Sequence, residues 1–129
     1  MYCLDTNVII DLFRGEEKLK EKVLEGGVDQ VFLTTISLCE LYKGAYISKR
    51  KDKSLEEIKN FLLGGFSVAS LDYSSCEEFG KIYNNLNSKG LMIPEFDIMI
   101  AAIVKANDLI LVTRDKKHFA NTGIKVEVW

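Results

Sequence analysis

The chain has 129 residues, which suffices for one domain with its own hydrophobic core but not for two. Hydrophobic residues make up 47% and charged residues 28%, as in an ordinary globular protein. No apolar run approaches the roughly 18 residues of a membrane-spanning helix, and an acid at position 5 argues against an export signal, so we expect a cytoplasmic protein. The net charge of −2 lacks the basic surplus of most nucleic-acid-binding domains, although metal bound to several carboxylates would make the balance positive.

Short apolar runs alternate with helical patterns along the whole chain. In chain order, strands are expected at 2–4, 31–34, 66–71, 109–112 and 124–128. Helices are expected at 8–13, 16–25, 37–48, 54–63, 74–88 and 97–106, with residues 48–53 as a charged connection and Ser54 as a cap. The last helix is apolar almost all round and should be buried. This alternation predicts a three-layer α/β/α fold with a parallel sheet, in a single domain over residues 1–129.

Four acidic residues are expected at the edge of the sheet where parallel strands end and helices begin. Asp5 follows the first strand, and Glu40 lies in the first turn of the helix after the second. Asp97 opens the apolar helix, and Asp115 follows the fourth strand. Ligands of open α/β sheets bind at this edge. Carboxylates crowded there repel one another unless a cation compensates, and an all-oxygen donor set favours Mg²⁺ or Mn²⁺.

Each of these acids also has an interpretation as an ordinary helix cap. Glu40 completes a Ser-x-x-Glu capping box with Ser37, and the same pattern recurs at 54–57 and 74–77. Single-residue capping is the alternative for Asp5, Asp97 and Asp115. A fifth acid at a strand end is interpreted as a turn or cap residue: Asp72.

The three cysteines and the single histidine suggest no further site. Cys3, Cys39 and Cys76 are odd in number and far apart, and each lies in an apolar stretch, so we expect buried, reduced thiols. His118 is alone, which leaves few ligands for zinc and no Ser–His nucleophile system. Its place beside Phe119 suggests a turn residue.

The motifs that contain the four acids resemble those of PIN-domain ribonucleases, most closely the VapC-type toxins of toxin–antitoxin pairs. The segments that carry the resemblance follow the family's order along the chain: LDTNVIID at 4–11, ISLCEL at 36–41, DIMIAA at 97–102 and LVTRD at 111–115. The similarity extends to the closing VEVW at 126–129. Each motif alone is weak, but all four in register over the full length are specific.

The resemblance implies a five-stranded parallel sheet and Mg²⁺- or Mn²⁺-dependent RNA cleavage by an activated water, leaving 5′-phosphate and 3′-hydroxyl ends. It also implies two sets of site residues. The catalytic metal ligands would be Asp5, Glu40, Asp97 and Asp115, and the polar residues that support them would be Thr6, Asn7 and Thr113. RNA also needs cations outside the acid cluster. The main candidates for phosphate contact are Arg14, Arg114 and Lys116, with Lys43, Lys117 and residues 49–51 as further candidates.

A cognate antitoxin and a homodimer are the expected protein partners. The expected interface is a surplus of apolar helix residues: Ile47, Leu55, Ile58, Phe61, Leu62 and Leu63. These side chains have an alternative interpretation as ordinary core. A housekeeping PIN-type RNA-processing nuclease, without an antitoxin, also remains open.

Two other classes of protein place acids at strand ends. An aspartate-nucleophile phosphatase would use Asp5 as its nucleophile, but the general-acid position holds Asn7. A receiver-like signalling domain would be phosphorylated at Asp72, but the acidic pair that receivers carry after the first strand is missing.

Overall fold

The core of the protein is one sheet of five parallel strands in the order β3-β2-β1-β4-β5. A computed structural model describes all 129 residues. The strand bounds are β1 Tyr2–Leu4, β2 Val31–Thr34, β3 Ser67–Ala69, β4 Ile110–Val112 and β5 Lys125–Glu127. The five predicted strands are confirmed, although the last three are shorter than expected. Because β1 is central and the chain then builds outward on both sides of it, the strand order reverses beside β1.

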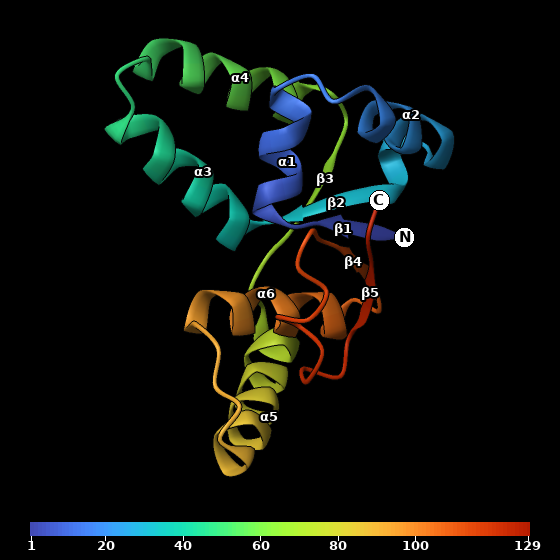
Figure 1. Cartoon of the computed structure of the whole chain (residues 1–129), viewed down its shortest axis with the longest axis vertical. Coiled ribbons are helices and arrows are strands. Elements are labelled where there is room, and N and C mark those ends of the chain that lie inside the picture. The colour runs from blue at the N-terminus through green and yellow to red at the C-terminus, as the bar shows by residue number, and fades with distance from the viewer.

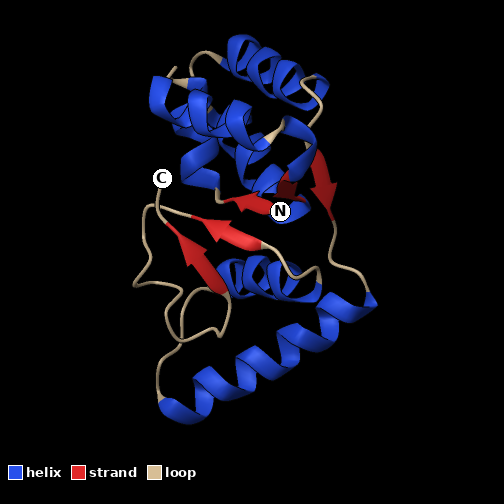
Figure 2. Ribbon diagram, turned by 90° about the vertical axis from the view of Figure 1, so that its right-hand side faces the viewer, coloured by secondary structure: helices blue, strands red, loops and turns tan.

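Helices cover both faces of this sheet, which confirms the three-layer α/β/α prediction. Figures 1 and 2 show α1–α4 on one face and α5 with α6 on the other. The bounds are α1 Thr6–Phe13, α2 Glu17–Gly26, α3 Thr35–Ile47, α4 Lys51–Leu63, α5 Tyr73–Lys89 and α6 Glu95–Ala106, with a short 3₁₀ turn at Val28–Gln30. None of the helices combines the length and apolar character required to span a bilayer.

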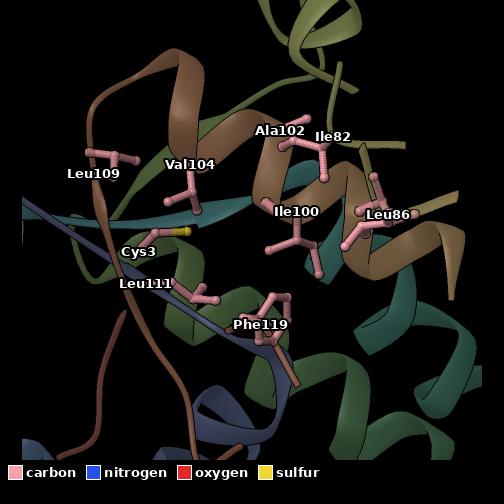
Figure 3. Packing of buried hydrophobic residues seen from close by; sticks show 11 residues of the cluster. Cys3, Ile82, Leu86, Ile100, Ala102, Val104, Leu109, Leu111 and Phe119 are labelled. Atoms are coloured by element: carbon pink, nitrogen blue, oxygen red, sulfur yellow. The ribbon is translucent and has the colours of Figure 1, made fainter. Parts of the chain in front are cut away.

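The two-residue period of the strands divides the core into two clusters. Leu4 and Leu33 point to the side of α1–α4, whereas Cys3 and Leu111 point to the side of α5 and α6. Figure 3 shows the second cluster, in which α6 lies between the sheet and α5. Six residues of α6 are fully buried, as its all-round apolar pattern predicts. Burying one such Ile or Val side chain contributes about 1.5–3 kcal/mol, so this packing fixes the position of the first turn of α6.

Several predicted helix caps are wrong because the helices begin earlier. Helix α4 begins at Lys51, so Ser54 lies inside it and caps nothing. Thr34 caps α3 by accepting a hydrogen bond from the Ser37 N–H at 3.0 Å, so no capping box forms at 37–40. Helix α5 is capped by Asp72, not by a box at 74–77. The N–H and hydroxyl of Ser75 stabilise the Asp72 carboxylate and lower its pKa, which agrees with its interpretation as a cap.

Two of the three cysteines are exposed, which corrects the expectation of three buried thiols. Cys39 and Cys76 lie on the solvent-facing sides of α3 and α5, because the helical period points their apolar neighbours inward instead. Cys3 is buried, and burial raises the pKa of its thiol to about 12. This thiol therefore stays protonated and unreactive at neutral pH.

Candidate active site

Asp5 joins the carboxyl ends of the two central strands. It follows β1 directly, and its Oδ2 accepts a hydrogen bond of 2.8 Å from the hydroxyl of Thr113, which follows β4. Its Oδ1 accepts from the Thr6 N–H at 2.9 Å, so the predicted helix cap at this position is present as well. Asp5 is therefore held at the point where the strand order reverses, where open α/β sheets bind ligands.

Glu40 reaches the same place from the other side of β1. Because α3 begins at Thr35, Glu40 lies in its second turn and not in the first as expected. Its Oε1 accepts a hydrogen bond of 2.8 Å from the Thr6 hydroxyl, so Thr6 contacts both Asp5 and Glu40. The capping-box interpretation of Glu40 is wrong, because its carboxylate is directed at α1 rather than at the start of its own helix.

Asp97 and Asp115 are linked by His118. Asp97 is the third residue of α6, whose N-cap position is occupied by Pro94, so the prediction of Asp97 as a helix cap is wrong. Its Oδ2 lies 2.7 Å from Nε2 of His118. The His118 backbone N–H donates to Oδ1 of Asp115 at 3.1 Å, which closes a turn and not a helix. The sequence suggested only a turn residue at His118. Its three-residue spacing from Asp115 was the feature that could have indicated a hydrogen bond between these two residues.

All four acids line one cavity of ≈ 390 Å³. Thr6, Asn7 and His118 also line it, and Lys43 is the only Lys or Arg side chain that does so. The structure thus brings together four carboxylates from segments far apart in the chain, with the side chain of Lys43 beside them.

Burial and repulsion between neighbouring charges raise the pKa of two of these carboxylates, Asp5 and Glu40. Burial is the largest cause that raises the pKa of Asp5, and the charge of Asp97 raises it further against the hydrogen bonds from Thr113 and Thr6. Burial likewise raises the pKa of Glu40, with contributions from the charges of Asp97 and Asp5, while the Thr6 hydroxyl and Lys43 act in the opposite direction. A bound cation would relieve both effects.

The four carboxylates line the cavity separately and do not form a compact set of metal ligands. No group of three His, Cys, Asp or Glu side chains is gathered closely enough to hold a metal ion. Thr113, Thr6 and His118 each hold one oxygen of Asp5, Glu40 and Asp97. The structure therefore shows four acids lining one cavity, three of them oriented by hydrogen bonds from neighbouring side chains.

Of the cations predicted to contact RNA, Lys43 lines the cavity, whereas Arg14, Arg114 and Lys116 lie outside it. Arg114 pairs with Asp11, with Nη2 2.9 Å from Oδ2, and also with Glu16, so it ties the loop after β4 to the end of α1. Arg14 lies in a neighbouring hollow between α1, α3 and α4. Lys116 is exposed.

Comparison with known proteins agrees with this arrangement. The family model described as PIN domain matches residues 2–125. The chain belongs to the PIN-domain family. It is therefore neither an aspartate-nucleophile phosphatase nor a receiver domain. Asp72, the residue that a receiver would phosphorylate, follows the edge strand β3 and caps α5.

The similar proteins match over almost their whole length. Ribonuclease VapC2 of Haemophilus influenzae is 29% identical over 99% of this chain and 97% of its own length. The tRNA(fMet)-specific endonuclease VapC of Shigella flexneri is 26% identical over 99% and 97%. Among solved structures, DNA-bound VapBC from Salmonella typhimurium superposes with a TM-score of 0.93 at 27% identity, covering 99% of this chain and 97% of that one.

Proposed function

We propose that this PIN-domain protein is a Mg²⁺- or Mn²⁺-dependent endoribonuclease of the VapC type, the toxin of a toxin–antitoxin pair. The observation that carries the proposal is one cavity at the carboxyl ends of β1 and β4, lined by Asp5, Glu40, Asp97 and Asp115. The full-length similarity to proteins named as VapC ribonucleases supports the activity. Solved structures of VapBC assemblies that share the fold support an antitoxin partner.

The donor set fits a hard divalent cation. All four acids offer oxygen, and the raised pKa values of Asp5 and Glu40 mean that a cation would stabilise their charged forms. Asp5 and Asp97 would be the primary ligands, Glu40 would bind the ion or orient water, and Asp115 would complete the set. A bound Mg²⁺ or Mn²⁺ supplies Lewis-acid polarisation of the scissile phosphate and lowers the pKa of a bound water.

The remaining polar residues of the site would hold these groups in register. Thr6 and Thr113 restrain the carboxylates of Asp5 and Glu40 through the hydrogen bonds described above. Asn7 lines the cavity and would support substrate or solvent there. Lys43 would neutralise a phosphate beside the cut, and Arg14, Arg114 and Lys116 would contact phosphates farther along the strand.

The direct test is cleavage of a labelled RNA of mixed sequence by the purified chain. With EDTA we expect no cleavage, because the proposed reaction needs a divalent cation to polarise the phosphate and to lower the pKa of the attacking water. Mn²⁺ added back in excess of the chelator should restore cleavage, with 5′-phosphate and 3′-hydroxyl ends. Cleavage that continues unchanged in EDTA would contradict a metal-dependent nuclease.

A homodimer is a second part of the proposal. Only two of the six apolar residues expected at its interface are exposed. Ile58 is buried, while Leu55, Phe61 and Leu62 pack against the core, so these four belong to the fold, as their alternative interpretation held. Ile47 and Leu63 are 79% and 75% exposed. We expect sedimentation velocity to show a dimer that weakens when Ile47 is changed to serine. A strictly monomeric profile at high protein concentration would count against the dimer.

A further inference from the structure

The side chain of His118 contacts one of the proposed metal ligands, Asp97, and this contact is not part of a helix cap. Its Nε2 lies 2.7 Å from Oδ2 of Asp97, and this contact joins the loop after β4 to the first turn of α6. Both side chains are partly exposed to the cavity, at 30% for His118 and 24% for Asp97. The contact is therefore made at the wall of the site and not in the packed core.

Two further contacts fix the imidazole ring in this position. The His118 backbone N–H donates to Oδ1 of Asp115 at 3.1 Å, so the turn that begins at Asp115 aims the ring. The ring also packs edge-on against Phe119, with centroids 5.2 Å apart and an interplanar angle of 87°. Phe119 is 1% exposed and belongs to the core cluster around α6. The ring is thus anchored to the core on one side and to Asp97 on the other.

The same arrangement recurs at the other acids of the cavity. The Thr113 hydroxyl donates to Oδ2 of Asp5, and the Thr6 hydroxyl donates to Oε1 of Glu40. Each carboxylate thus has at least one oxygen held by a neighbouring side chain, and the second oxygen of Asp5 accepts from the Thr6 N–H. In Asp97, the donor is the imidazole of His118, which leaves Oδ1 as the oxygen without a hydrogen bond from a side chain.

We propose that His118 is a positioning residue that holds the Asp97 carboxylate in the rotation required for binding a divalent cation. This inference rests on the proposed metal-dependent function and adds to it a residue that does not itself contact the ion. Hydrogen bonds to ligating carboxylates raise metal affinity, and removing such a partner typically weakens binding by about 10–100-fold. The opposite role, in which His118 competes with the ion for Asp97, predicts tighter binding once the ring is removed.

The test is the dissociation constant of Mn²⁺ for the purified full-length chain, measured by calorimetric titration without RNA. His118→Phe keeps a ring beside Phe119 but loses the contact with Asp97, and we expect its Mn²⁺ binding to weaken about 10–100-fold. His118→Gln retains an N–H that can reach Asp97 and should recover part of the affinity. Asn121→Gln, at an exposed polar position in the same loop and outside the cavity, is the matched control and should bind Mn²⁺ like the wild type.

The variants separate positioning from a general structural role. Melting temperatures in EDTA should agree for wild type, His118→Gln and Asn121→Gln, because the contact with Asp97 orients a side chain at the surface of the cavity. Equal or tighter Mn²⁺ binding by His118→Phe would overturn the proposal, as would equal losses in the Phe and Gln variants. If the wild type itself binds no Mn²⁺, the metal site of the proposed function fails. If it binds Mn²⁺ and His118→Phe binds equally well, only the role of His118 fails.

Discussion

Changing Asp97 to asparagine is expected to abolish RNA cleavage and to leave the fold intact. Asp97 makes no helix-capping hydrogen bond, and its side chain lies at the cavity wall, so the amide should be accommodated without repacking. The carbonyl oxygen of asparagine can still accept from His118 Nε2. The amide cannot balance the charge of a cation, so cleavage should fall at least about a hundredfold, as when one charge-stabilising group is removed from other active sites.

Cleavage of the same labelled RNA at saturating Mn²⁺, with circular dichroism of both proteins, measures this effect. The matched control is Asp72→Asn, an acid-to-amide change at an aspartate that caps α5 outside the cavity. Asparagine caps helices about as well as aspartate, so this control should cleave RNA at the wild-type rate. Near-normal cleavage by the Asp97→Asn protein would exclude Asp97 from the active site.

Mn²⁺ is expected to raise the melting temperature of the wild type but not that of a double variant, Asp5→Asn with Asp97→Asn. An ion that binds only the native state stabilises it by about 2.7 kcal/mol at a hundred times its dissociation constant. For a domain of this size the melting temperature should then rise by several degrees. The double variant lacks both proposed primary ligands, so its melting temperature should not respond. Equal shifts in the two proteins would show that the ion binds elsewhere.

In EDTA the double variant should be at least as stable as the wild type. Burial raises the pKa of Asp5 above its ordinary value of 3.8, so the folded chain binds a proton there more readily than the unfolded chain. The ionised form of Asp5 therefore destabilises the metal-free fold at neutral pH, and its contribution improves as the pH falls toward 3.8. Asparagine removes the charge, and its oxygen can still accept from the Thr6 N–H while its amide nitrogen donates to the Thr113 hydroxyl, the reverse of the present bond. A double variant that melts well below the wild type in EDTA would contradict this account.

The layout of the fold could be predicted from the sequence because its strands are short apolar runs between clear helical patterns. The strands at 2–4 and 31–34 have the predicted bounds, and the all-round apolar pattern of α6 correctly indicated a buried helix. Helix starts were less predictable, since several residues near each start could serve as the cap. Thr34 caps α3 and Asp72 caps α5, although Ser37 and Ser74, which lie inside these helices, matched the capping-box pattern.

The position of the acids followed from topology, but their hydrogen-bond partners did not. Parallel strands bring residues such as Asp5 and Asp115 to one edge whatever the side-chain packing. The contact between His118 and Asp97 depends instead on the path of the loop after β4, which contains no helix or strand to make it periodic. The same holds for Arg114, whose ion pairs with Asp11 and Glu16 are set by how that loop crosses α1.

The most direct test of a catalytic metal site at the four acids is a Mn²⁺ titration followed by two signals, the melting temperature and the initial rate of RNA cleavage. The ion that relieves the crowded carboxylates should be the ion that supports the reaction. Under matched buffer conditions we therefore expect both signals to rise to half of their maximum at the same Mn²⁺ concentration in the wild type, and neither to rise in Asp97→Asn. Cleavage at full rate before any ion has bound, or cleavage that follows Mn²⁺ in the Asp97→Asn protein, would contradict it.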